Sequence, residues 1–147
     1  MNPLTPLIRK AVFALAALSL AAAAACAAAP ADPGPVTSAL TEAEATAIAE
    51  NALAALNAGD YAAWSRDWED TLKGAINEDA FLAYREQALQ QVGRYQSILA
   101  VEMAPSPKTG HVRWVFTCQF EKAKVRLIMA FPQDGKRADT VRTEPAN

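Results

Sequence analysis

The apolar side chains of this chain change their spacing once, at Gly93. Before this glycine they recur every three or four positions, which is the spacing of helices that bury one face. After it they alternate with polar residues, as in strands that bury one face of a sheet. A block of helices followed by a block of strands predicts an α+β domain. We expect three N-terminal helices packed on a curved antiparallel sheet of three to four strands.

Capping signals mark where these helices begin and end. Thr41 and Glu44 form a capping box, in which the Thr41 hydroxyl accepts a backbone N–H and Glu44 bonds back to the helix start. The first helix is expected to stop at Gly59. Asn77 is the expected start of the third helix, which ends before Gly93.

Between the first and the third helix, the sequence predicts a single second helix from Asp60 to about Lys73. Two ion pairs, Arg66–Asp70 and Glu69–Lys73, are expected four residues apart on its exposed side. Its apolar stripe consists of four side chains at helical spacing: Tyr61, Trp64, Trp68 and Leu72.

Strands are expected over 95–103, 111–120 and 125–131, with a short polar strand over 137–142. Asp134-Gly135 is a hairpin signal before the last strand. The clearest alternation is in the second strand, whose expected inward residues are Val112, Trp114, Phe116, Cys118 and Phe120.

The first thirty residues predict an export signal. Arg9 and Lys10 precede an apolar run over 12–20, which is too short to cross a bilayer and is followed by alanines. Ala-Ala-Ala-Cys at 23–26 resembles the bacterial lipoprotein box, with Ala23 where a larger aliphatic residue is usual. Cys26 is therefore the predicted lipidation site, which would anchor the chain on the extracytoplasmic side of the cell membrane.

Ordinary cleavage is the alternative to lipidation. A cut after Ala29 or Ala31 fits the small-x-small rule and would give a secreted or periplasmic soluble protein. With lipidation, the predicted organisation is a signal peptide over 1–26, a Pro/Ala-rich tether over 27–38, the α+β domain and a short tail. The domain is expected over 39–143 and the tail over 144–147.

Charge and cysteine content restrict the partners. Removal of Arg9 and Lys10 with the leader takes the net charge from −2 to −4, which argues against nucleic acid binding, since this needs clustered Lys and Arg. The lipid is then the only predicted membrane contact. With Cys26 modified or removed, Cys118 has no disulfide partner, and its phase predicts a buried, inert thiol. One histidine and one cysteine cannot build a zinc site, so no metal or cofactor is predicted.

Several segments resemble the nuclear-transport-factor-2-like family, also called SnoaL-like or cone-fold domains. They are Leu-Asn-Ala-Gly-Asp-Tyr at 56–61 followed by Trp64 and Trp68, Tyr-Gln-Ser at 95–97, Trp-Val-Phe at 114–116 and Phe-Glu-Lys at 120–122. The combination is similar to exported bacterial members and covers about residues 40–136. The resemblance implies a conical pocket between the concave face of the sheet and the helices. Because such folds serve both enzymes and non-catalytic scaffolds, it does not decide function.

The pocket would be lined by aromatic side chains. Trp64, Trp68 and Trp114 are the candidate ligand-contacting residues, although aromatic residues at this spacing usually belong to a filled core. Asp67 and Tyr84 are the candidates for acid–base catalysis, but the pattern around Asp67 favours a solvated carboxylate beside core aromatics.

Three further residues were weighed for function. His111, the only histidine, is expected on the surface at a strand start. Ile128 and Ala130 fall on the outer face of the sheet, which predicts either a homodimer interface or modest apolar exposure. The sequence therefore favours a non-catalytic lipoprotein domain that binds a small ligand or an envelope protein. A SnoaL-like isomerase, cyclase or hydrolase and a structural dimerisation module are the alternatives.

Overall fold

The computed structural model describes residues 35–147. The predicted leader, Cys26 and most of the predicted tether lie outside these residues. Within them, four helices precede four strands. The helices are α1 (Glu42–Ala58), α2 (Tyr61–Trp64), α3 (Asp70–Ala75) and α4 (Glu78–Gln91). The strands are β1 (Tyr95–Pro105), β2 (His111–Phe120), β3 (Lys124–Pro132) and β4 (Thr140–Pro145).

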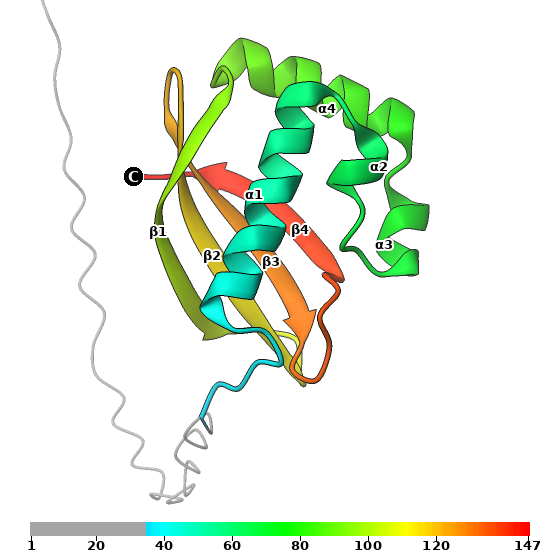
Figure 1. The fold of residues 1–147 in the computed structure, drawn as a ribbon, viewed down its shortest axis with the longest axis vertical. Coiled ribbons are helices and arrows are strands. Elements are labelled where there is room, and N and C mark those ends of the chain that lie inside the picture. The colour runs from blue at the N-terminus through cyan, green and yellow to red at the C-terminus, as the bar shows by residue number, and fades with distance from the viewer. Residues whose placement is uncertain (1–34) are drawn as a thin grey trace, which may run out of the picture. The chain divides into compact units, whose positions relative to one another are not determined.

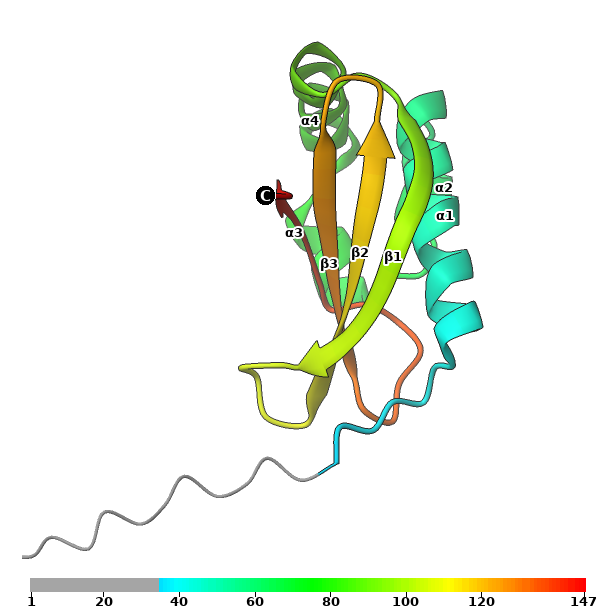
Figure 2. The same ribbon diagram turned by 90° about the vertical axis from the view of Figure 1, so that its left-hand side faces the viewer.

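The strands form one antiparallel sheet in the order β1-β2-β3-β4. α1 lies along one face of the sheet, from the end where β2 begins toward the end that carries the β2–β3 turn (Figure 1). α4 crosses this second end, and the side view shows how strongly the strands twist beside α1 (Figure 2). The predicted α+β class with an antiparallel sheet is confirmed.

The helix ends follow the predicted capping residues. Thr41 Oγ1 accepts from the Glu44 N–H at 3.2 Å, and Glu44 Oε2 accepts from the Thr41 N–H at 2.9 Å. Gly59 ends α1 with a φ of 76°, a left-handed conformation that glycine adopts without strain. Asn77 Oδ1 accepts from the Ala80 N–H at 2.9 Å and starts α4.

Two polar side chains fix the last turn of α1. The Tyr95 N–H donates to Asn57 Oδ1 at 3.0 Å, and Asn57 Nδ2 donates to the Tyr95 carbonyl at 2.9 Å. Arg85 of α4 donates to the carbonyls of Leu56 and Asn57 at 2.8 and 2.9 Å. Carbonyls in the last turn of a helix have no partner within the helix, so Arg85 satisfies them. These contacts join α1, α4 and the start of β1.

The prediction of one continuous helix from Asp60 to about Lys73 is wrong, because two short helices, α2 and α3, flank a non-helical segment. Two backbone groups of that segment bond to Ala138. The Glu69 N–H donates to the Ala138 carbonyl, and the Ala138 N–H donates to the Asp67 carbonyl, both at 2.8 Å. Trp68 lies between Asp67 and Glu69 and is 1% exposed. Burial of its indole and the backbone bonds to Ala138 outweigh the helix propensity of the segment.

The interruption also changes the ion pairs. Arg66 Nη2 contacts the neighbouring Asp67 at 3.0 Å, and Asp70 contacts Arg137 at 3.1 Å. The predicted Arg66–Asp70 pair is therefore not formed, because the two residues no longer lie on one helix.

The inner face of the sheet carries the core. All five predicted inward residues of β2 are at most 5% exposed, so its alternation is confirmed. The first four of them pair with Phe131, Met129, Leu127 and Val125 of β3, in that order. Ala45 and Ala49 on the facing side of α1 are fully buried, because their small side chains let the helix approach the sheet closely.

The last strand lies further along the chain than predicted. β4 begins at Thr140 and ends at Pro145, so the domain includes residues assigned to the tail. Residues 137–139 do not extend β4 because Ala138 pairs with the α2–α3 segment. Asp134-Gly135 lies in a longer connection and not in a two-residue hairpin loop.

Candidate functional site

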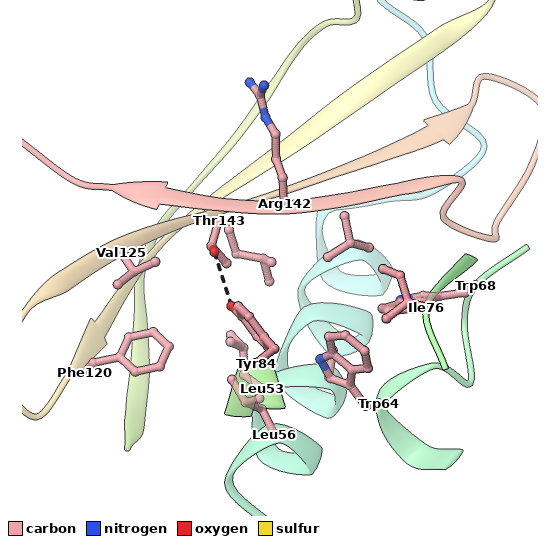
Figure 3. A pocket seen from close by; sticks show the side chains of 13 residues that line it. Leu53, Leu56, Trp64, Trp68, Ile76, Tyr84, Phe120, Val125, Arg142 and Thr143 are labelled. Atoms are coloured by element: carbon pink, nitrogen blue, oxygen red, sulfur yellow. Dashed lines mark hydrogen bonds between the residues drawn. The ribbon is translucent and has the colours of Figure 1, made fainter. Parts of the chain in front are cut away.

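A cavity of about 190 Å³ lies between the second half of α1, α4 and the inner face of β2, β3 and β4. Its walls are mainly aliphatic and aromatic side chains (Figure 3). They come from Ala52, Leu53, Leu56, Trp64, Trp68, Ile76, Tyr84, Phe120, Val125, Leu127, Val141, Arg142 and Thr143. We call this space the cavity.

The break between α2 and α3 determines one wall of the cavity. It places the rings of Trp64 and Trp68 edge to face, with their centroids 4.4 Å apart. Phe81 of α4 supports Trp64 from behind, with ring centroids 4.5 Å apart. Ala52 of α1, which also lines the cavity, contributes only a methyl group. A side chain this small leaves space that a larger one would fill.

Trp68 also brings an unsatisfied donor to the cavity wall. Its Nε1 is buried and has no acceptor among residues 35–147. A buried N–H without a partner costs about 1–3 kcal/mol, so such atoms are rare in folded proteins. An acceptor on a bound molecule would lower this cost.

Tyr84 and Thr143 form a polar contact at the edge of the cavity. The Tyr84 hydroxyl lies 3.2 Å from Thr143 Oγ1, so one hydrogen bond joins α4 to β4 (Figure 3). The Arg142 side chain points away from the cavity in the same view. The hydroxyls of Tyr84 and Thr143 are therefore the polar side-chain groups that this part of the wall presents.

The structure brings together three of the predicted site residues and separates two. Trp64, Trp68 and Tyr84 line the cavity. Trp114 does not, because its indole Nε1 donates to Ser38 Oγ at 3.3 Å near the start of α1. Asp67 is also outside the lining, and its carboxylate is bonded to Arg66.

The contributions of α1 and β4 to the cavity are not evident from the sequence. Ala52, Leu53 and Leu56 have the spacing of ordinary core residues of a helix, and β4 lies later in the chain than the strand predicted over 137–142. The small side chain of Ala52 is the signal that indicates space on this face of α1.

The thiol of Cys118 is inert, as predicted. It is fully buried, and burial raises its pKa to about 11. Such a thiol has almost no reactive thiolate near neutral pH.

His111 lies at the other end of the sheet from the cavity. Its side chain is 14% exposed, less than a surface position suggests, because Nε2 lies 2.8 Å from Asp139 Oδ2. Lys108 contacts the same carboxylate. Burial opposes the charge of Asp139, but the hydrogen bond from Lys108 and the nearby His111 and Lys108 charges hold its pKa below the usual value.

The outer face of the sheet is less exposed than predicted. Ile128 is 3% exposed and Ala130 is 6% exposed. Ile128 lies between Val115 and Arg142 in neighbouring strands, and Arg113 is paired with Ala130. Long side chains beside small apolar ones reduce their contact with water. The homodimer through this face stays a prediction.

In residues 35–147, no cluster of three or more potential metal ligands is found, and no helix has the length and hydropathy to span a bilayer. Comparison with models of known protein families and with curated proteins finds no match.

Proposed function

We propose that this protein is a non-catalytic binding protein for a small apolar ligand, which occupies the cavity. The observation that carries this proposal is the apolar space beside Trp64 and Trp68 inside an otherwise close-packed core. The cavity is partly open, so its apolar walls lose van der Waals contacts with other side chains and are left in contact with water. A ligand that fills the cavity would restore those contacts.

The volume of the cavity matches a ligand about the size of one substituted aromatic ring. The cavity measures about 190 Å³. An engineered apolar cavity of roughly 150 Å³ takes up benzene and stays free of water. A flat ring in the cavity would gain contacts with its aliphatic and aromatic walls, and an acceptor on the ligand could bond to Trp68 Nε1.

The positions of the ionisable residues favour binding over catalysis. Asp67 and His111, the carboxylate and imidazole considered from the sequence, are not among the lining residues. Tyr84 is at the edge and already hydrogen-bonded to Thr143. Proton transfer requires a base within hydrogen-bond reach of the substrate, and neither the Asp67 carboxylate nor the His111 imidazole meets this condition for a ligand in the cavity.

The proposal includes the family and the location. Helices on the inner face of a twisted four-stranded antiparallel sheet are compatible with a nuclear-transport-factor-2-like domain. The basic and apolar leader with Cys26 supports a lipoprotein held outside the cytoplasm. Mass spectrometry of the mature protein tests the anchor. We expect a diacylglyceryl-modified N-terminal Cys26 that Cys26→Ser abolishes, whereas a mature chain starting at Asp32 would contradict lipidation.

Toluene is a suitable probe for the cavity. A ligand that binds only the folded state raises the melting temperature. We expect toluene to do so for the wild type but not for Ala52→Leu, which adds three carbon atoms inside the cavity. Ala54→Leu is the matched control, because Ala54 is an exposed residue of the same helix. If toluene has no effect on the wild type, or the same effect on both variants, the proposal is wrong.

A further inference from the structure

A second hollow lies beside the cavity, between α4 and the sheet end that carries the β2–β3 turn. This groove measures about 310 Å³. Tyr84, Phe120, Val125 and Thr143 line both spaces. Because the same residues contact both hollows, a single layer of side chains separates them.

One hydrogen bond closes part of this layer. Tyr84 and Thr143 meet at 3.2 Å across the gap between α4 and β4. A hydrogen bond of this kind contributes only about 1 kcal/mol net, and partly exposed side chains change rotamer in nanoseconds or less. Rotation of Tyr84 would therefore open a passage without movement of the backbone.

The two hollows differ in chemistry. The cavity is apolar, whereas polar residues surround the groove: Gln87, Gln91, Lys124 and Glu144. Gln87 and Gln91 follow Tyr84 by three and seven positions, so all three lie on one face of α4. The groove lining contains one basic and one acidic residue, Lys124 and Glu144, so its formal charges cancel. The groove therefore offers hydrogen bonds without a net charge.

We propose that the cavity and the groove form one channel for an amphipathic molecule with a short apolar tail and an uncharged, hydrogen-bonding head. The proposal rests on the proposed function, since the tail occupies the cavity. The tail passes between Tyr84 and Thr143. The head, an alcohol or an amide, stays in the groove, where the carboxamides of Gln87 and Gln91 can each donate and accept. A charged head would lose hydration, and the groove lining has no excess of opposite charge to compensate for this loss.

Three probes with the same eight-carbon tail test the head group: octan-1-ol, octanoate and octylammonium. Their affinities for the purified full chain are measured by calorimetry at constant pH and ionic strength. We expect octan-1-ol to bind at least about fivefold more tightly than either ion, since an unpaired charge is costlier to desolvate than a hydroxyl.

Variants test the position of the head and of the tail. Gln87→Ala and Gln91→Ala should each lower the affinity for octan-1-ol by about two- to tenfold, which is the range for one lost hydrogen bond. Gln90→Ala is the matched control, because Gln90 is exposed on the same helix and is not part of the groove. Ala52→Leu and Val141→Phe fill the cavity from α1 and from β4. Both should lower the affinity for all three probes. Circular dichroism identifies any variant that has not folded.

The outcomes separate this inference from the proposed function. If toluene binds but the three head groups bind equally, or the glutamine variants match Gln90→Ala, the channel is wrong and the cavity remains a binding site. If octan-1-ol binds as well to folded Ala52→Leu and Val141→Phe as to the wild type, the tail does not enter the cavity and the channel is again wrong. If neither toluene nor octan-1-ol binds, both proposals fail.

Discussion

The two halves of α1 cover two different kinds of core. At the packed end, Ala45 and Ala49 lie over the part of the sheet formed by Val112 and Phe131, and all four side chains are fully buried. At the hollow end, the same helix continues past Ala52 over the cavity. α1, β2 and β3 are continuous through both ends, whereas β4 pairs only with residues 125–130 of β3. The cavity therefore comes from the side chains at this end and from the break between α2 and α3, and not from an interruption of α1, β2 or β3.

The difference shows how a small domain can combine stability with a binding site. Close packing at one end holds the sheet against α1, while Asn57 and Arg85 fix the helix end above the cavity by hydrogen bonds. These polar contacts do not depend on filling the space between α1 and the sheet. The frame can therefore stay in place when the cavity is empty.

The largest contrast is expected from truncating one phenylalanine at each end. Phe131→Ala at the packed end should lower the free energy of unfolding by about 5 kcal/mol, because it creates a new void. Phe120→Ala at the hollow end should cost only about 3 kcal/mol, since Phe120 already borders open space. Urea unfolding of both variants measures the difference. Equal losses would contradict a difference in packing between the ends.

A smaller contrast is expected from enlarging one alanine at each end. Ala49→Leu should cost about 1–3 kcal/mol, because Ala49 is fully buried against the sheet and a larger side chain is overpacked. Ala52→Leu should change stability by less than about 0.5 kcal/mol, since the added carbons enter the cavity and cause no overpacking. Urea unfolding again gives both values. If Ala52→Leu lowers the free energy of unfolding by more than this, the cavity is closed in solution.

Features with a local cause could be predicted from the sequence. The capping box of Thr41 and Glu44, the start at Asn77 and the stop at Gly59 depend on residues a few positions apart, and each is found. The alternation of β2 identified its inner face for the same reason, since one strand has only two faces.

Features with a distant cause could not be predicted. The helix break before Trp68 depends on Ala138, which lies far along the chain, and the pattern of Trp64, Trp68 and Leu72 continues through it. Trp114 is predicted to line the pocket together with Trp64 and Trp68 because it is aromatic, but its indole donates to Ser38. Two of the three predicted tryptophans therefore line the cavity, and the third is part of the closely packed core.

The smallest effect is expected from acid at the packed end, where Asp139 contacts Lys108 and His111. The pKa of Asp139 is lowered in the folded protein, so its stabilisation is present above the unfolded value of about 4 and is lost as the pH falls through the folded value. We expect Asp139→Asn to reduce stability at pH 6 by less than about 1 kcal/mol and to flatten its decline below about pH 4. Urea unfolding across this pH range checks the prediction, which an unchanged slope in the variant would contradict.

Benzene titration followed by methyl NMR tests the central claim most directly, because it reports on both ends of the core at once. The account predicts saturable chemical-shift changes at the methyl groups of Leu53, Leu56 and Leu127, which line the cavity, and none at Leu40 or Val112. Absence of any saturable change, or equal changes at both ends, would contradict a defined apolar binding site.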